Sequence, residues 1–591
     1  MKKHTSLNSK SMPRLSTVFK FGFIPVLLVM LAINLRYFNM QPPRSLATRE
    51  QVEIQDYMKF NNPELANQVI TQLNVFEPVT NKYFPEKTPK YGDYYFGLID
   101  DNEYCKNHQA WFTKNSESVF LQKNVFTNYP TNSLIRELVI RKFGNDMHPN
   151  IDFGSNKNKN HSNSIHNLRT DTNLIVVHGM PHIFKELGKS FACISQEYNK
   201  IPGHEGINRK DNLARSVTRY TESYLSRPQC FNNTKFFPET WSLINKTQCQ
   251  QFFKKFNSKE YALERAQKGI VYIRKIGNGA HQAKGVQPVT IEEERSIRKL
   301  YKNGSLCGQV NKSYLIQTYV YNPLLLNGHK FDFRIYLVIA STNPTMAYYY
   351  DGFLRVSLHP YDINSKDKSV LLTNTALSAN IFEIAKKEGH YQGLTEEELR
   401  NFQMWNFDRL QAYLLEQGRI TDKNWLNNYL RPEFKKAMIH LVRMVSDSLL
   451  KRSQVYELYG VDFMLDDNLN LWFIECNSGP VLSGSSKEKE IFVTKMLVDQ
   501  FEIVSGLLKS RMKRVIQYVN KIIEENQVNR LPGGAIEIKD LEIKQKEFKK
   551  LIENRFEREY ELSWNNGFSK IVDENYEGVE RYSGLISEEC L

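Results

Sequence analysis

The chain has 591 residues, of which 41% are hydrophobic and 12% aromatic, a composition that favours a globular protein and excludes a largely disordered one. Its 79 lysines and arginines outnumber its 65 aspartates and glutamates by 14, which favours an acidic partner. No nucleic-acid-binding signature accompanies this excess, so we expect no nucleic-acid partner. Seven scattered cysteines without a CxxC pair argue against a disulfide framework and a structural zinc site, and suit a reducing compartment.

The N-terminus combines a basic tail, residues 1–17, with an apolar segment, residues 18–38, that we expect to be a transmembrane span or signal anchor. Phe21–Leu35 carries no charge, although it is shorter than the roughly 20 residues that a spanning helix needs. The lysines before it favour translocation of the remainder, whereas three arginines soon after it weaken that bias. We expect the rest to face the cytosol, with the segment inserted in reverse or lying in the membrane interface.

Residues 39–91 are dotted with proline and asparagine and predict a stalk with one or two short helices. Residues 92–509 predict a mixed α/β domain, and residues 510–591 a basic helical extension and tail. In chain order we expect strands at Tyr94–Ile99, Asn173–His178, Gly269–Ile273, Tyr314–Tyr321, Phe331–Ser341 and Met346–Leu354, and helices at Asp211–Leu225, Thr395–Gln417 and Arg431–Arg452.

The segment Gly269–Val286 (GIVYIRKIGNGAHQAKGV) predicts a strand that ends near Lys275 and runs into a glycine-containing loop. Backbone amides of such a loop can approach phosphate oxygens, and the lysine supplies positive charge. A glycine-containing hairpin turn without a ligand is the alternative.

The segment Lys330–Tyr336 (KFDFRIY) alternates polar and apolar side chains, which predicts a strand with one polar and one apolar face. A buried row of cation, anion, cation and phenol is costly unless something polar is held there, and Arg355 on the next strand can join it. A surface edge strand is the alternative. The polar row consists of Lys330, Asp332, Arg334 and Tyr336, and the apolar row of Phe331, Phe333 and Ile335.

The segment Tyr459–Pro480 (YGVDFMLDDNLNLWFIECNSGP) predicts a β-hairpin with a turn at Asp466–Asn468. Strand alternation places Glu475 and Asn477 on one face, with Asp462 at the same height across the turn. Such hard oxygen donors suit Mg²⁺ and do not suit zinc. The alternative is that this face of the hairpin is polar only because it faces solvent. The other face should point to a core through Trp472, Ile474 and Cys476.

Together KFDFRIY, the LTN of Leu372–Asn374, GVDFM and the ECN hairpin resemble the tubulin–tyrosine ligase-like family. The similarity extends upstream to Ile201–Val217 and Phe236–Leu243, and covers roughly Tyr94 to Lys509. It implies an α/β (α+β) fold with an ATP-grasp-like ligase core at about residues 265–480, in which N-terminal and central lobes clamp ATP. It also implies that an amino acid is joined to a carboxylate of tubulin.

The resemblance implies a role for each matching residue. Asp462, Glu475 and Asn477 match the ligands of Mg²⁺, for which two ions are expected. Catalysis is expected of Lys210, Arg334 and Arg355. ATP is expected to contact Lys210, Lys275, Gln317, Thr318, Tyr319, Val320, Lys330, Asp332, Arg355, Thr373 and Asn374.

The implied chemistry converts a glutamate side chain of an acidic tubulin tail to an acyl phosphate, which a free amino acid then attacks. No nucleophilic cysteine or serine is required, and the net positive charge suits the acidic tails. The location implied is the cytoplasm and cytoskeleton, with a cilium or basal body as an alternative. Contacts with microtubules are expected from the cations Lys509, Arg511, Lys513 and Arg514.

Three departures from the family pattern concern amino-acid choice and turnover more than ATP binding. Ile276 stands where the family has proline, Lys284 is the obvious cation left in the glycine loop, and Ala379 stands where glutamate-adding members have lysine. We expect glutamate as the amino acid and the polyglutamylase branch as the nearest, with glycine and then tyrosine as alternatives. Two further alternatives are a membrane-tethered microtubule-binding protein with weak or lost catalysis, and a lumenal ligase for a secreted acidic protein, which glycans at Asn232 or Asn245 would support.

Overall fold

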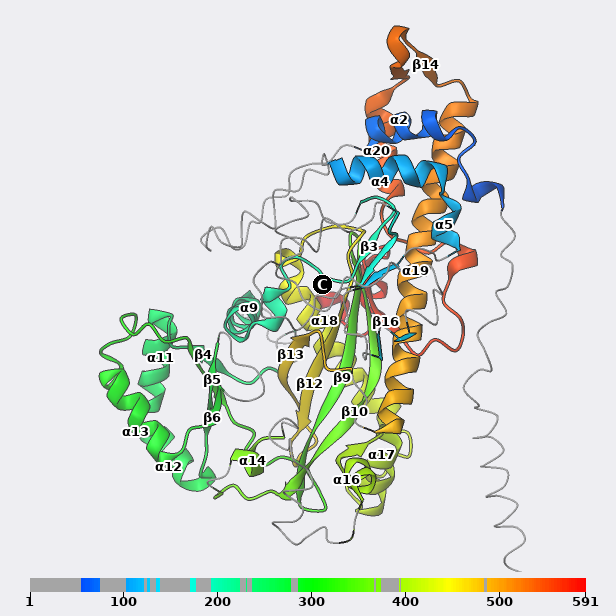
Figure 1. Ribbon diagram of the computed structural model, residues 1–591. Coiled ribbons are helices and arrows are strands. Elements are labelled where there is room, and N and C mark those ends of the chain that lie inside the picture. The colour runs from blue at the N-terminus through cyan, green and yellow to red at the C-terminus, as the bar shows by residue number, and fades with distance from the viewer. Residues whose placement is uncertain are drawn as a thin grey trace, which may run out of the picture. The chain divides into compact units, whose positions relative to one another are not determined.

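The computed structural model describes residues 55–74, 103–121, 125–127, 134–135, 137–138, 171–176, 193–223, 230, 236–277, 285–365, 368–373, 393, 395–482 and 486–590 (Figure 1). Within these ranges no helix is both long and apolar enough to cross a membrane. The predicted anchor at residues 18–38 and the expected strand Tyr94–Ile99 lie outside them, as do Lys284, Asn374 and Ala379.

The described chain contains both helices and strands, as the sequence patterns predict for residues 92–509. The helices are α2 (Pro63–Leu73), α4 (Glu103–Lys114), α5 (Glu117–Phe120), α8 (Glu205–Asn208), α9 (Lys210–Ser223), α11 (Lys246–Phe256), α12 (Lys259–Lys268), α13 (Ile291–Leu300), α14 (Lys368–Leu371), α16 (Glu396–Gln403), α17 (Phe407–Glu416), α18 (Arg431–Val445), α19 (Lys487–Glu524) and α20 (Leu541–Leu551). The strands are β1 (Val125–Thr127), β2 (Leu174–Val176), β3 (Glu197–Tyr198), β4 (Thr240–Ser242), β5 (Tyr272–Ile276), β6 (Val286–Pro288), β7 (Tyr314–Thr318), β8 (Leu325–Leu326), β9 (His329–Thr342), β10 (Thr345–Pro360), β11 (Met404–Trp405), β12 (Glu457–Leu465), β13 (Leu471–Ser478), β14 (Val528–Arg530), β15 (Ile536–Ile538) and β16 (Ser569–Asp573).

The largest sheet has the order β11-β10-β9-β12-β13, with β16 added to β10 and β8 added to β9. Strand β9 lies inside this sheet, between β10 and β12, so the predicted polar and apolar faces are both covered and the edge-strand alternative is wrong. Phe331, Phe333 and Ile335 join one core with helices α17 and α18. Tyr336 and Val338 join a second core with α19 on the opposite face. The alternation of β9 therefore sets which helices cover each face of the sheet.

The predicted hairpin is present as the antiparallel pair β12 and β13, but it contains a β-bulge. Asp462 pairs with Glu475 and Phe463 pairs with Phe473, so Ile474 is an extra residue on β13. One extra residue reverses the alternation. As a result Phe473 and Cys476 both join the core, whereas Ile474 and Trp472 are only half-buried and stay outside that cluster. The prediction that Trp472 and Ile474 face the core is therefore wrong.

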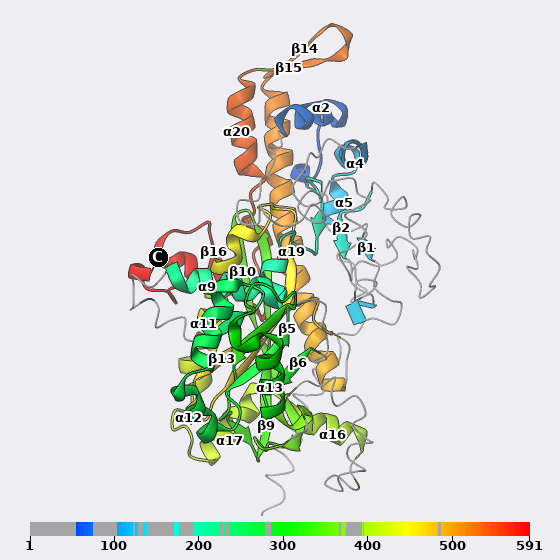
Figure 2. The same cartoon turned by 90° about the vertical axis from the view of Figure 1, so that its left-hand side faces the viewer.

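A separate four-stranded sheet, ordered β4-β7-β5-β6, carries α11, α12 and α13 and faces the viewer in Figure 2. Its core is a stack of aromatic rings in which the Phe252 and Phe256 centroids lie 4.6 Å apart. Each helix begins with a side chain that accepts a backbone N–H: Asn245 for α11, Ser258 for α12 and Thr290 for α13. These caps explain why the three helices start where they do.

Six of the seven cysteines form disulfides, which contradicts the prediction that the chain has no disulfide framework. The bonds join Cys105 to Cys193, Cys230 to Cys590 and Cys249 to Cys307. Cys476 alone is free, and it is buried. The partners are 88, 360 and 58 residues apart, so no local spacing in the sequence could reveal them.

The C-terminal residues are part of the fold and not the separate basic extension and tail that the sequence predicts. Helix α19 runs without a break through the predicted boundary at 509/510, residues 54–591 form one compact unit, and β16 pairs with β10. The expected exposed cations are largely held inside: Arg511 is fully buried, and Arg514 is paired with Glu557. Lys513 is paired with Glu559. These side chains therefore stabilise the fold, and the microtubule contacts expected of them have no support.

Two further segments differ from expectation. Part of the predicted stalk, the short helix Asp56–Met58 and α2, packs on α19, where Asn520 exchanges hydrogen bonds with the backbones of Lys59 and Asn61. The predicted helix Thr395–Gln417 is two helices, α16 and α17, because Met404 and Trp405 between them pair with β10 as β11. The capping box at Thr395 and Glu398 confirms the predicted start of this region.

Candidate active site

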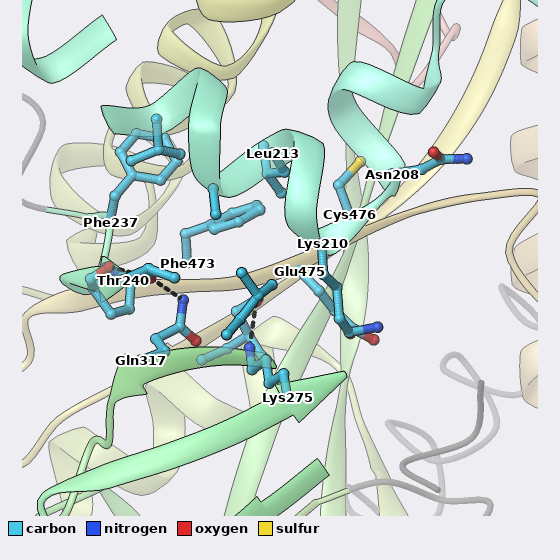
Figure 3. Close-up of a pocket in the computed structure, with 15 residues that line it drawn as sticks. Asn208, Lys210, Leu213, Phe237, Thr240, Lys275, Gln317, Phe473, Glu475 and Cys476 are labelled. Carbon is cyan, nitrogen blue, oxygen red and sulfur yellow. Dashed lines mark hydrogen bonds and ion pairs between the residues drawn. The ribbon is translucent and has the colours of Figure 1, made fainter. Parts of the chain in front are cut away.

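The candidate active site lies where the hairpin β12–β13 meets β9, β10 and the four-stranded sheet (Figure 3). The carboxylates of Asp462 and Glu475 stand directly opposite each other in the strand register. A group of arginines from β9 and β10 surrounds Asp462, and two lysines approach Glu475. The two sets of charges are therefore adjacent halves of one site.

The first half is a buried network of two arginines and two aspartates. Arg334 donates from Nε and Nη2 to the two oxygens of Asp462, at 2.6 and 3.0 Å. Arg355 donates from Nε to Asp332 at 2.6 Å and forms an ion pair with Asp462 at 2.9 Å. The hydroxyl of Thr373 donates to the other oxygen of Asp332. Each charge is therefore matched by an opposite charge, which buried ionic groups require.

The local fold makes this network possible. Gly460 pairs with Asn477 and lies beside Arg334; a Cβ at Gly460 would come within 3.0 Å of the Arg334 side chain and 2.9 Å of Pro480. Glycine at this position lets the guanidinium cross the strand toward Asp462. Burial raises the pKa of Asp332, as does nearby Asp462, although Arg355 opposes the shift. The two arginines and two aspartates balance one another, so this half holds its guanidinium groups in fixed positions.

The second half is a carboxylate between two lysines. Lys210, the first residue of α9, pairs with Glu475 at 3.2 Å, and Asn477 donates to the same carboxylate at 3.2 Å. Lys275 on β5 donates to the backbone carbonyl of Ile474, the bulged residue, at 3.2 Å. Burial raises the pKa of Glu475, but Lys210 and Lys275 outweigh it and hold the value at about 2. Burial also lowers the pKa of Lys275, to about 8.

A third cation, Lys330 on β9, is buried beside Tyr319, which directly follows β7. Its ammonium donates to the Tyr319 hydroxyl and to the Leu371 carbonyl, both at 2.9 Å. It also lies 4.5 Å from the centre of the Tyr319 ring. Burial lowers the pKa of Lys330 to about 7. Its two hydrogen-bond partners are neutral, so when protonated this lysine has positive charge that an anion can use.

The remaining predicted residues lie along β7. Gln317 donates to the Thr240 hydroxyl at 2.9 Å, and the backbone N–H of Thr318 donates to Glu239 at 2.9 Å. Val320 follows the strand and is half-buried. The structure thus brings the described predicted residues to one region, whereas Asn374 lies outside the described residues.

A pocket lies between β7, β13 and α9, shown in Figure 3. Its polar end is formed by Lys210, Lys275 and Glu475, and its apolar part by Leu213, Phe237 and Phe473. Asn208 also lines it, and its buried Oδ1 accepts no hydrogen bond within the described part of the chain. A pocket with lysines at one end and aromatic and aliphatic walls at the other suits a ligand that combines phosphates with a flat ring.

The oxygen donors fit a hard cation, because Asp462, Glu475 and Asn477 are grouped on one ribbon and none is a soft ligand. Their charges are balanced by Arg334, Arg355 and Lys210. Among the described residues no cluster of three or more histidines, cysteines, aspartates and glutamates could hold a metal. Any ion here would therefore be held by two carboxylates, an amide and a ligand such as a phosphate.

Sequence reasoning missed Lys489, which lies in the first turn of α19. Burial, together with charge repulsion from Arg334, Arg355 and Arg400, lowers the pKa of Lys489 to about 8. Its ammonium lies 5.7 Å from the Phe353 ring, and no ion pair joins it to a described carboxylate. Four cations near one another favour an anion among them. Lys489 lies in the SKEKE stretch, whose mixed charges give no sign of proximity to the arginines.

A supporting cluster under the site was missed for the same reason. Glu457 on β12 accepts from Lys200 at 2.9 Å and from His204 at 2.8 Å, all buried. Burial raises the pKa of Glu457, but His204 and Lys200 overcome it and hold the value at about 2. These contacts fix the segment before α9, and so the position of Lys210.

Comparisons with known proteins identify a family and several relatives. Residues 189–514 match the tubulin-tyrosine ligase family. Protein polyglycylase TTLL10 of Macaca fascicularis is 28% identical over 47% of this chain and 43% of its own length. Inactive polyglycylase TTLL10 of Homo sapiens is 28% identical over 53% and 46%, and tubulin monoglutamylase TTLL4 of Mus musculus is 24% identical over 54% and 24%.

The chain thus spans less than half the length of these curated relatives. The polyglutamylase branch, which the sequence favoured, has only weak support, because the first two relatives are named polyglycylases. The family match covers more than half of the chain and includes the lysines, the arginine network and the carboxylate hairpin of the site. The chain therefore belongs to the tubulin-tyrosine ligase family.

Proposed function

We propose that the protein is an ATP-dependent ligase that joins a free amino acid to a glutamate side chain of an acidic protein tail. The observation that carries this proposal is the pairing of Asp462 with Glu475, flanked by two arginines on one side and two lysines on the other. An arrangement of cations and hard oxygen donors around a small pocket suits phosphoryl transfer to a carboxylate. The names of two relatives as polyglycylases and one as a tubulin monoglutamylase support amino-acid ligation, and the tubulin tail is the acceptor that one of those names gives.

The reaction has two steps that balance. The acceptor carboxylate oxygen attacks the γ-phosphorus of ATP, the bond to the β–γ bridging oxygen breaks, and ADP leaves. The amine nitrogen of the amino acid then attacks the acyl carbon, the carbon–oxygen bond to phosphate breaks, and inorganic phosphate and a proton leave. An amide bond remains, and no covalent bond to the enzyme is needed.

Each side chain has a role in this scheme. Lys210 and Lys275 hold phosphate oxygens and stabilise the charge that develops on them. Mg²⁺ held by Asp462, Glu475 and Asn477 would supply further charge neutralisation. The two bonds from Arg334 to Asp462 use two of its five N–H donors, so others remain to hold the acyl phosphate.

The free cysteine supports a mechanism without a covalent enzyme intermediate. Cys476 is buried on the core face of β13, and burial raises the pKa of its thiol well above the usual value. A protonated, enclosed thiol is a poor nucleophile. Its place next to Glu475 is therefore structural.

We propose glycine, in place of the glutamate expected from the sequence, as the amino acid. The first two relatives are named polyglycylases, and Ala379 stands where glutamate-adding members of the family have a lysine. An amino acid without a side chain needs no cation beyond those for its own carboxylate, and Lys489 near Arg334 supports that role.

The test is incubation of the purified full chain with ATP, Mg²⁺, microtubules and each labelled amino acid, followed by mass spectrometry of the acceptor peptides. Glycine added to glutamate side chains is the expected result. Incorporation of glutamate alone would overturn the amino-acid proposal. ATP binding with no incorporation into any acidic acceptor would leave a catalytically inactive protein, a possibility that the name of the human relative raises.

A further inference from the structure

The three disulfides cross-link three different parts of the fold. Cys105 on α4 is bound to Cys193 before β3, and Cys249 on α11 is bound to Cys307 within the four-stranded lobe. Cys230, after α9, is bound to Cys590, which ties the last described residues to the catalytic domain. Each part of the fold therefore carries one cross-link.

This pairing is complete and specific. The Cα atoms of the three pairs are 5.4–5.6 Å apart, within the range that a disulfide needs, and all six side chains are buried. The seventh cysteine, Cys476, is enclosed in the core and has no partner to exchange with. Such a set of cross-links persists in oxidising compartments and is rare in the cytosol.

The glycosylation sequons give a second, independent observation. Three of the five lie in the described residues, at Asn245, Asn303 and Asn311, and all three asparagines are exposed. All three lie on the four-stranded lobe, close in sequence to the cross-linked Cys249 or Cys307. An exposed N-x-S/T in a protein of the secretory pathway is an acceptor for N-glycans.

We propose that the ligase domain folds and works on the lumenal or extracellular side of a membrane, with three disulfides and N-glycans at Asn245, Asn303 and Asn311. The inference rests on the proposed function for its substrate class: the acceptor is a glutamate-rich protein of that compartment, and ATP and the free amino acid are drawn from the same side. Each pair of thiols gives two electrons and two protons to a disulfide donor of the compartment, which is reduced to a dithiol.

The sequence before the domain agrees with this side of the membrane. Lys2, Lys3, Lys10, Arg14 and Lys20 precede the uncharged segment Phe21–Leu35, and positive residues tend to stay on the cytosolic side. The odd number of scattered cysteines suggested free thiols and so a cytosolic protein. The structure pairs six of the seven cysteines, so we replace the cytosolic expectation by a lumenal one.

The first measurement counts free thiols on the full chain isolated from its own cells. Acid at lysis stops thiol–disulfide exchange, and maleimide then labels the free thiols. Intact mass after denaturation should show one labelled cysteine without reductant, Cys476, and seven after reduction. More than one labelled cysteine without reductant overturns the proposal.

The second measurement reads glycans as asparagine converted to aspartate by enzymatic deglycosylation, located by peptide mass spectrometry. Conversion is expected at Asn245, Asn303 or Asn311, and its absence from all three overturns the proposal. Thr247→Ala should abolish conversion at Asn245 while keeping the helix cap, and Thr247→Ser should preserve both.

Neither readout depends on catalysis. If the protein has one free thiol and intact glycans but ligates no amino acid to microtubules or to a glutamate-rich peptide, the proposed function is overturned and the proposed compartment stands. Ligation of microtubules by a protein with seven free thiols would do the reverse.

Discussion

Replacing Glu475 by glutamine tests the centre of the site, because it keeps the size of the side chain and removes its charge. Lys210 and Lys275 hold the pKa of Glu475 at about 2, against 4.5 for an ordinary glutamate, despite the opposing effect of burial. A lowered carboxylate pKa gives stability that is present above the unfolded-state value and is lost as pH falls toward the folded-state value. The relevant window is therefore pH 4.5 to 2.

The magnitude follows from the two pKa values. The charged carboxylate contributes about 3.4 kcal/mol to the free energy of unfolding at pH 6 and about 1.4 kcal/mol at pH 3. Glu475→Gln lacks this dependence, so the stability difference between wild type and variant should shrink by about 2 kcal/mol between those pH values. Ligation should be abolished at any pH, because the variant loses the negative charge and one of the two carboxylate oxygens that Glu475 offers to the proposed metal site.

The assay is urea unfolding followed by circular dichroism at pH 6 and pH 3, at one ionic strength and without reductant, with ligation measured in parallel. Asp467→Asn is the matched control, because Asp467 lies in the turn of the same hairpin, is exposed and pairs with Arg419. The control should keep activity. Near-normal ligation by Glu475→Gln, or a stability difference that does not change with pH, would refute the assignment of Glu475.

Other predictions follow from groups that the site holds in unusual states. Burial lowers the pKa of Lys330 to about 7, so its positive charge is lost as pH rises through that value. The dissociation constant for ATP should therefore increase by up to about fivefold from pH 7 to 8, and calorimetry of Lys330→Met should show weaker, pH-independent binding. Lys489→Ala should raise KM for the amino acid by about tenfold with kcat little changed, measured by steady-state ligation, and an unchanged KM would remove Lys489 from the amino-acid site. Arg511 is buried and paired with Glu197, so Arg511→Met should lower the free energy of unfolding in urea by about 3 kcal/mol or more. The control Lys546→Met, on the surface of α20, should change it very little. Equal stabilities of the two variants would contradict the structural role of Arg511.

The strand patterns determined the hydrophobic layers of the site region. Alternation along Lys330–Tyr336 predicted both faces of β9, and the turn residues Asp466–Asn468 predicted the hairpin that carries Asp462 and Glu475. Such patterns are local, since each side chain's face depends on its neighbours along one strand. For the same reason the sequence missed the bulge at Ile474, which shifts the pairing through contacts between strands.

Contacts between distant segments were decided by the tertiary structure. The Cys230–Cys590 bond joins residues 360 apart, Arg511 reaches Glu197 across the fold, and Lys489 comes near Arg334 from a helix that follows the hairpin. None of these has a spacing rule, because any two residues far apart in sequence can meet once the sheets and helices pack. The sequence by itself therefore determined which residues can do chemistry and on which strand faces they lie; packing decided which charges neutralise one another, which thiols are paired, and which cations remain to hold an anion.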